Sequence, residues 1–200
     1  MRRAVALPAF PLLLLLASCA GPWKIDRINH GTPGYTMLRG RVALPRGQHE
    51  KTNCGPETVC AALNYLGIAV SIDEAERAVY DPAIKGATSV AILDFARRKG
   101  ADPEISDDGG LWKLQDHLEV DQPVMIEVTR GGYYHFFLVA GLSRENRTVV
   151  FADYDNSQLE MGFDDLVAVW QPAQFRSITF TPARAEKLEY QGREFLEGGR

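Results

Sequence analysis

Hydrophobic and polar positions divide the chain into a helical first part and a strand-rich second part. Apolar residues recur at helical spacing in three segments, which predicts helices from about Cys54 to Tyr65, from Ser71 to Tyr80 and from Ser89 to Lys99. A fourth, shorter helix is predicted at about residues 111–118. Gly67 and Gly100 follow two of these segments, where glycine commonly ends a helix.

Extended segments follow the helices. Each combines β-branched, aromatic and aliphatic residues between turn-forming residues, which is typical of strands. The segments in which we expect strands are 123–129, 133–142, 148–153 and 176–181, with a further short strand somewhere in 35–44. Residues 163–170 are predicted to form a short helix. Helices first and antiparallel strands second indicate an α+β fold.

The chain is therefore expected to contain one globular domain with extensions at both ends. Residues 1–18 have the pattern of a targeting signal, and residues 19–44 are expected to form a tether, mainly over 20–34, and a leading strand. The domain is predicted at residues 45–181. The charged tail, residues 182–200, is expected to be a helix or a loose end.

The N-terminal signal resembles that of bacterial lipoproteins. A basic start and an apolar centre precede Leu16-Ala17-Ser18-Cys19, a string similar to the lipobox, in which the cysteine thiol carries diacylglycerol. The resemblance implies lipidation at Cys19, with the chain in the bacterial cell envelope on the outer membrane, facing the periplasm. An ordinary secretory signal cut near Ala17 or Ala20 is the alternative. The apolar run is too short for a comfortable membrane span.

Composition and charge exclude some functions. The 200-residue chain has a net charge of −4 and no basic stripe, so we expect no nucleic-acid partner. No His-Glu-x-x-His string and no cluster of Cys and His residues indicates a metal site, and no cofactor is expected.

The remaining two cysteines differ in their surroundings. In one continuous helix Cys54 and Cys60 would lie about 9 Å apart along the axis and on different faces, so they should not form a disulfide. Cys60 lies among apolar residues and fits the core. Cys54 begins the helix next to polar residues, where unpaired backbone N–H groups and the helix dipole favour a thiolate. We therefore predict Cys54 as a nucleophile, with the amide side chain of Gln48 a short loop upstream.

A nucleophilic cysteine needs a base, and His135 is the strongest candidate among the four histidines. It interrupts a strongly apolar strand and shares a face with Tyr133, Phe137 and Val139 by alternation. The simpler interpretation is a buried histidine satisfied by a backbone carbonyl. A turn between antiparallel strands would bring Asp153 to the same end of the sheet, where a carboxylate can orient the imidazole. Asp155, two residues on, is the alternative.

Together these residues resemble the papain-like bacterial peptidases of the bacteriocin-processing, double-glycine leader type. Three strings carry the resemblance: Gln48 with Asn53-Cys54-Gly55-Pro56, then residues 134–141, and then Phe151-Ala152-Asp153. It implies Cys54 as nucleophile, His135 as base and acid, and Asp153 as the orienting residue. It also implies that Gln48 donates its amide to an oxyanion hole together with the Cys54 backbone N–H. Family members often have proline after the aspartate, where this chain has Tyr154.

The resemblance implies a membrane-anchored thiol peptidase that acts on a peptide or protein substrate, in a chain with no phosphate-binding glycine motif and therefore expected to act without a fused exporter. A double-glycine cleavage preference is not carried over. The alternatives are an inactive substrate-binding domain of the same fold in a secretion pathway, with secretion machinery as its partner, and an amidase or acyltransferase that uses the same residues.

Overall fold

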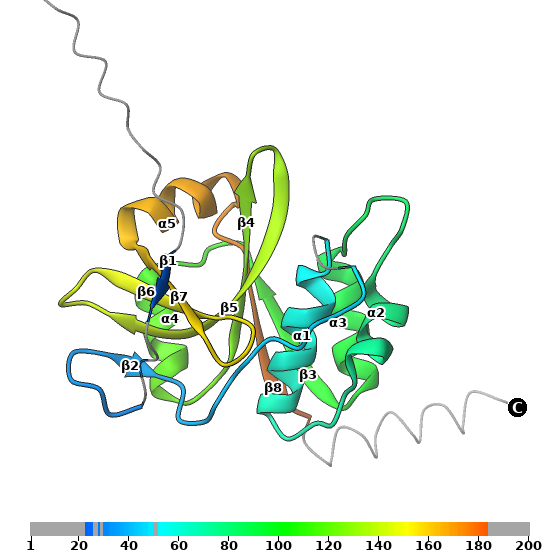
Figure 1. Ribbon diagram of the computed structural model, residues 1–200, viewed down its shortest axis with the longest axis horizontal. Coiled ribbons are helices and arrows are strands. Elements are labelled where there is room, and N and C mark those ends of the chain that lie inside the picture. The colour runs from blue at the N-terminus through cyan, green and yellow to red at the C-terminus, as the bar shows by residue number, and fades with distance from the viewer. Residues whose placement is uncertain (1–22, 26–27, 29, 50–51, 184–200) are drawn as a thin grey trace, which may run out of the picture.

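The structure, a computed structural model, describes residues 23–25, 28, 30–49 and 52–183 (Figure 1). Its α-helices are α1 (Cys54–Tyr65), α2 (Ile72–Val79), α3 (Ser89–Arg98), α4 (Leu111–Glu119) and α5 (Phe163–Trp170), the last followed by a 3₁₀ turn, Gln171–Ala173. Its strands are β1 (Trp23–Ile25), β2 (Thr36–Met37), β3 (Ala101–Ser106), β4 (Val124–Arg130), β5 (Tyr133–Ser143), β6 (Thr148–Ala152), β7 (Gln158–Gly162) and β8 (Ser177–Pro182).

These strands form one antiparallel sheet with the order β1-β7-β6-β5-β4-β8-β3, and β2 also pairs with β5. The helices α1, α2 and α3 form a separate group beside it, at the right of Figure 1. The predicted α+β class is confirmed, with the helical group α1 to α3 ahead of most of the antiparallel strands. The long central strand β5 is the element on which the helical group and the sheet meet.

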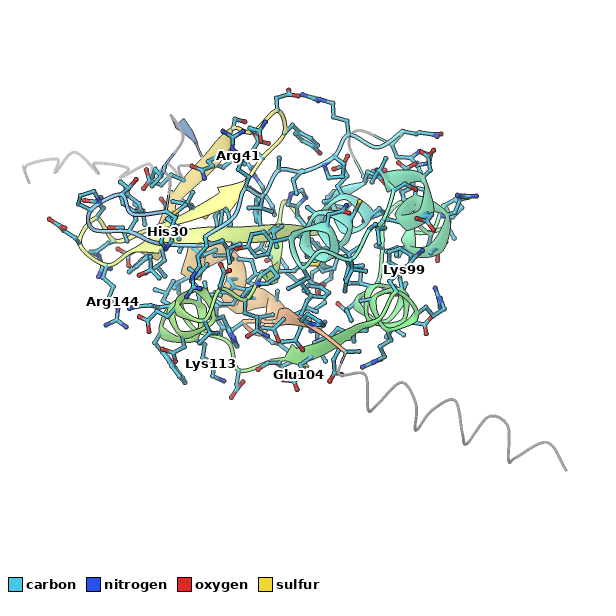
Figure 2. The ribbon with its side chains drawn as sticks, turned by 90° about the horizontal axis from the view of Figure 1, so that it is seen from below. His30, Arg41, Lys99, Glu104, Lys113 and Arg144 are labelled. Carbon is cyan, nitrogen blue, oxygen red and sulfur yellow. The ribbon has the colours of Figure 1, made fainter. Side chains whose placement is uncertain are left out.

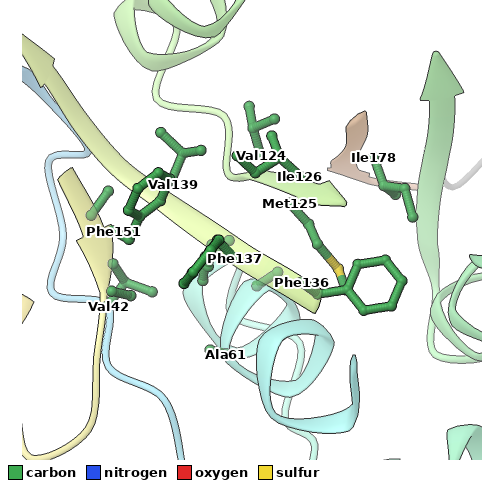
Figure 3. Close-up of a cluster of buried hydrophobic side chains, with 14 of the residues drawn as sticks. Val42, Ala61, Val124, Met125, Ile126, Phe136, Phe137, Val139, Phe151 and Ile178 are labelled. Carbon is green, nitrogen blue, oxygen red and sulfur yellow. The ribbon is translucent and has the colours of Figure 1, made fainter. Parts of the chain in front are cut away.

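The hydrophobic core lies where α1 packs against β5 (Figure 3). Residues 55–63 of α1 are all buried, and β5 is buried from Phe136 to its end. The first two residues of β5 remain exposed and His135 is half-buried. This strand therefore carries its only histidine to the boundary between core and solvent.

The helical predictions are confirmed, and local signals explain why. Ser71 and Glu74 form a reciprocal capping box at the start of α2. At α3 the side chain of Thr88 accepts a hydrogen bond from the backbone N–H of Ala91. Such caps satisfy N–H groups that have no partner within the helix.

Three strands were not predicted. Two of them, β1 and β3, pair with partners that are distant in the sequence, whereas β7 pairs with β6, its neighbour in the chain, and on its other edge with β1. The strand β1 lies within the expected tether but pairs with β7, so the prediction of a tether is wrong for Trp23–Ile25. The strand β3 contains Pro103 and alternates poorly, and it pairs with β8 at an edge of the sheet, where a residue without an N–H is tolerated. The strand β7 follows a tight turn after β6. The predicted tail lies, apart from Pro182 and Ala183, outside the described residues.

Candidate active site

Cys54 is the first residue of α1, where the prediction placed it. The helix can start here because Gly55 has no side chain. A Cβ atom on Gly55 would come within 2.5 Å of the Ala87 Cβ and 3.6 Å of Phe136 Cδ2. The start of α1 is therefore in close contact with the loop between α2 and α3 and with β5. The close approach puts the Cys54 thiol against the part of β5 that carries His135.

The thiol of Cys54 is less acidic than the sequence predicted. Burial raises its pKa above the ordinary value of 9.0, and the charge of Glu57 adds to the rise. Hydrogen bonds to the backbone of Phe136 and Gly55 act in the other direction but are smaller effects. The expected thiolate is therefore wrong for the resting site, because desolvation of a charged sulfur outweighs the stabilisation at the helix start. The sulfur is protonated at neutral pH.

His135 lies beside Cys54 in one cleft, lined also by Phe136 and by the turn between β4 and β5. Both central residues of that turn, Gly131 and Gly132, have positive φ values of 58° and 83°. Such a conformation suits glycine and matches the twist of the two strands, so the hairpin is tight. On the same face of β5 the His135 ring contacts the Phe137 ring edge-on, with 4.7 Å between centroids, as the alternation predicted.

The imidazole of His135 is neutral at physiological pH. Burial, and to a smaller extent the positive charge of Arg130, lower its pKa from 6.5 to about 4. A neutral imidazole can accept a proton from the neutral thiol of Cys54 when a substrate arrives. The pair is therefore suited to general-base activation of the sulfur at the moment of attack.

Asp153 follows β6 directly and is buried. Because Val139 of β5 pairs with Phe151 of β6, alternation places Asp153 on the same face of the sheet as His135. One carboxylate oxygen of Asp153 accepts a hydrogen bond of 2.7 Å from Ser157 Oγ. Asp153 is therefore buried and held by Ser157 on the face of the sheet that carries His135, and its orienting role toward the imidazole stays a prediction.

Asp155, the alternative orienting residue, has different surroundings. Its φ of 56° places it in the turn that leads to β7, and its side chain is 75% exposed. Its carboxylate forms an ion pair of 2.6 Å with Arg46. An exposed carboxylate held by an arginine on the turn is a poorer orienting group for an imidazole than a buried one.

Gln48 does not line the cleft that holds Cys54 and His135, as far as the described residues go. It lines a neighbouring cavity with His49 and Tyr80, whose rings stack on each other, and its backbone N–H donates to Glu76 Oε1 at 2.5 Å. Residues 50 and 51, between Gln48 and Cys54, are outside the described ranges. The oxyanion role of Gln48 stays a prediction.

Two buried carboxylates that the sequence analysis missed hold the cysteine side of the site. Glu57 accepts hydrogen bonds from the backbone N–H of Gly47 at 2.9 Å and from the hydroxyl of Tyr154. Glu76 accepts from the Gln48 N–H and from Asn53 Nδ2, both at 2.5 Å. The sequence pattern that could have revealed them is a glutamate on the apolar face of each helix, because a charge is rarely buried without partners.

The other predicted residues give no further chemistry to the site. Cys54 and Cys60 are both free, as predicted, and Cys60 donates to the carbonyl oxygen of Val70 in the core. Cys19 and the rest of the predicted signal lie outside the described residues. Within the described ranges, no group of His, Cys, Asp and Glu side chains is arranged to hold a metal ion, and no helix has the length and apolar character to cross a membrane.

An α+β domain that places a helix-start cysteine against a histidine on the central strand has the arrangement of a cysteine peptidase. The Peptidase_C39 like family matches residues 44–178 of the chain. The chain therefore belongs to this family, and the family and fold are of the cysteine-peptidase type. No curated protein matches the chain.

Solved structures share the fold at low sequence identity. The peptidase domain of Streptococcus ComA, a bifunctional ABC transporter involved in a quorum-sensing pathway, has a TM-score of 0.56 at 17% identity, covering 71% of this chain and 98% of that domain. A double-glycine motif protease from an AMS/PCAT transporter, solved with its leader peptide, has a TM-score of 0.55 at 16% identity, with 74% and 97% covered. A C39-like peptidase from Bacillus anthracis has a TM-score of 0.53 at 13% identity, with 71% and 98% covered.

Proposed function

We propose that the chain is a thiol peptidase that hydrolyses peptide bonds through Cys54 and His135. The observation that carries the proposal is the shared cleft, in which the thiol at the start of α1 and the imidazole on β5 lie with the backbone of Phe136 against the sulfur. Family membership and the fold of known peptidase domains support the same reaction class.

In the first half of the reaction, neutral His135 accepts the thiol proton as the Cys54 sulfur attacks the carbonyl carbon of the substrate. The negative charge that develops on the carbonyl oxygen is stabilised by the backbone N–H of Cys54 at the helix start and by the Gln48 amide. The C–N bond then breaks, and protonated His135 gives its proton to the leaving amine. A thioester on Cys54 remains.

In the second half, His135 takes a proton from a water molecule that attacks the thioester. The bond to sulfur breaks, the acid product leaves, and the proton returns to the sulfur. Asp153 orients the imidazole and stabilises its charged form during both halves. Since each step requires the imidazole to change its charge, a buried carboxylate on its face of the sheet is useful at each proton transfer.

The test is hydrolysis of a mixed peptide library, measured by mass spectrometry under reducing conditions. Wild type should release fragments, and Cys54→Ala should release none above the uncatalysed background. Cys60→Ala is the matched control, because it removes the core thiol and should retain hydrolysis. Equal product formation by wild type and Cys54→Ala would refute the proposal.

A thiol-alkylating reagent separates the peptidase from an inactive binding domain of the same fold. In a peptidase, Cys54 should react faster than Cys60, and His135→Ala should slow its labelling because the base that activates the sulfur is gone. Labelling that does not change in His135→Ala would favour a domain that holds a substrate without cleaving it. Transfer of the acyl group to an added amine would instead indicate an acyltransferase.

The proposal also includes attachment to the bacterial outer membrane through a lipid on Cys19, with the domain facing the periplasm. It rests on the lipobox-like string Leu16-Ala17-Ser18-Cys19. In cells given a labelled fatty acid, the wild-type chain should carry the label and sediment with membranes. Cys19→Ala should do neither, and label on that variant would contradict the site.

A further inference from the structure

The cleft that is lined by Cys54 and His135 has two walls. It has a volume of about 590 Å³. One wall is the loop between α2 and α3, with Ile84 and Lys85, and the other is the turn between β4 and β5, with Tyr133 and Tyr134. In Figure 1 both segments project at the top of the molecule, on either side of the start of α1. A chain lying between them would pass directly over the sulfur.

Large apolar side chains are exposed on both walls. Ile84 is 55% exposed, Tyr133 79% and Tyr134 63%. They come from segments about fifty residues apart in the sequence and line the same cleft. Exposed apolar groups that gather around one concavity indicate a binding surface rather than scattered surface residues. Ring faces and a branched aliphatic chain suit an aromatic or large aliphatic side chain of a partner.

Among the described residues, the side-chain charges that line the cleft are all positive. Its charged lining groups are Lys85 and Arg130, with no carboxylate, and neither cation forms an ion pair with a described residue. Arg130 stands close enough to His135 for its charge to lower the pKa of the imidazole. The positive charge therefore reaches the catalytic end of the cleft, where a bound carboxylate would meet both the field of Arg130 and that of Lys85.

The wall that carries Lys85 is ordered by its own hydrogen bonds. The backbones of Asp81 and Gly86 exchange two bonds, of 2.7 and 3.2 Å, and the Asp81 carboxylate accepts from the N–H of Ala83 at 2.8 Å. Ala87, just after the loop, packs on Gly55. The loop backbone that carries Lys85 is thus ordered before a ligand arrives, which reduces the backbone entropy lost on binding.

From these observations we infer that the substrate segment is an extended peptide with an acidic residue next to an aromatic or large aliphatic one, close to the scissile bond. The carboxylate would lie between Lys85 and Arg130, and the apolar side chain between Ile84 and the two tyrosine rings. The inference rests on the proposed function for the cleavage, but the binding preference follows from the cleft itself.

Binding is tested first, with the full chain carrying Cys54→Ala so that no turnover occurs. Two fluorescein-labelled peptides of the same length, each with one phenylalanine, differ only in a neighbouring Glu or Lys, and anisotropy measures their Kd. The Glu peptide should bind about tenfold more tightly, since opposite charges attract and like charges repel across an interface. Equal Kd values for the two peptides would overturn the inference.

Charge reversal then locates the preference. Lys85→Glu and Arg130→Glu should each weaken binding of the Glu peptide and strengthen binding of the Lys peptide. Arg144→Glu is the matched control, because this exposed arginine is in the turn between β5 and β6 and lies at the periphery in Figure 2. It changes the net charge by the same amount and should leave both Kd values unchanged. A control that shifts the Kd values as much as Arg130→Glu would show a net-charge effect and refute the site.

Hydrolysis by the protein with Cys54 intact separates the two proposals. If library peptides are cleaved with Glu and Lys equally represented near the cut bond, the peptidase proposal is supported and the inferred preference for an acidic residue is refuted. Selective binding of the Glu peptide without any hydrolysis would support the inference and count against the peptidase. Cleavage enriched in acidic residues supports both.

Discussion

The cysteine side of the cleft is embedded in the protein, whereas the histidine side stands where β5 leaves the core. At the start of α1, buried Asn53, Glu57 and Glu76 connect the helix to the Gly47–Gln48 backbone by hydrogen bonds. On β5, burial falls away toward the hairpin turn, where the side chains are open to solvent.

This difference in burial separates two tasks, holding the nucleophile in place and contacting the substrate. A buried network of charged hydrogen bonds holds its members in one arrangement, because each lost bond leaves an unpaired polar group in the core. The cysteine and the first residues of α1 are therefore held rigidly. The hairpin has few buried contacts beyond His135, so changes there should alter substrate binding and proton transfer with little effect on folding.

The largest effect is expected for His135→Ala, which tests whether the histidine side of the cleft serves catalysis and not stability. Loss of the base should lower kcat/KM by about 10²–10⁴-fold, while the free energy of unfolding changes by no more than about 1 kcal/mol. Peptide hydrolysis and denaturant unfolding measure the two quantities. His117→Ala, in α4 and outside the cleft, is the control and should retain activity. A large loss of stability in His135→Ala would mean that the histidine side is also structural.

Glu76→Ala tests the cysteine side. It removes the acceptor for the Gln48 N–H and for Asn53 Nδ2 and leaves both donors short of a partner, so the free energy of unfolding should fall by about 2–4 kcal/mol. Glu74→Ala, two residues earlier in α2 with a side chain only partly buried, should cost clearly less. Urea unfolding compares them, and similar losses would show that the buried network does not hold the site.

The pH dependence of hydrolysis sharpens the electrostatic part of the comparison. His135 acts as a base only when neutral, and its pKa is lowered to about 4 by burial and by Arg130. The acid limb of kcat/KM should therefore lie near pH 4, well below the ordinary 6.5. Arg130→Ala should move the limb upward, yet keep it below 6.5 because burial is the larger cause. A wild-type limb at 6.5 or above would contradict this.

The same lowered pKa predicts how stability depends on pH. Between pH 6.5 and 4 the imidazole of the unfolded chain binds a proton that the folded chain does not, so the contribution of His135 to stability is present above pH 6.5 and is lost as the pH falls. Unfolding of wild type should become easier from pH 7 to pH 5. His135→Gln should remove part of this slope, and an unchanged slope would exclude His135 as its source.

Tyr133→Ser should have the smallest effect on stability. The side chain is exposed, so the free energy of unfolding should change by less than about 0.5 kcal/mol. The KM for peptides with an aromatic residue should still rise, by about threefold to tenfold, because one wall of the cleft loses its ring. Steady-state kinetics measure the change. A fall in kcat at constant KM would show that the tyrosine positions the catalytic groups instead.

Local patterns were sufficient for most of the helices and for the central strands. Helical periodicity and the glycines that follow two of the helices mark α1 to α3 within a residue or two. The strands β4, β5 and β6 are apolar enough to be recognised singly. The strands β1, β3 and β7 were missed because they are short or polar, and β1 and β3 also owe their extended form to partners far along the chain.

The sequence by itself determined that a thiol starts a helix, that a lone histidine interrupts an apolar strand, and that an aspartate ends the next apolar run at the same end of the sheet. Short-range periodicity contains that information. Only the tertiary structure decided that Cys54 is half-buried and protonated, that Glu57 and Glu76 hold the residues around it, and that Lys85 and Arg130 face one cleft. Burial and the pairing of distant charges depend on how the elements pack, and no local segment encodes them.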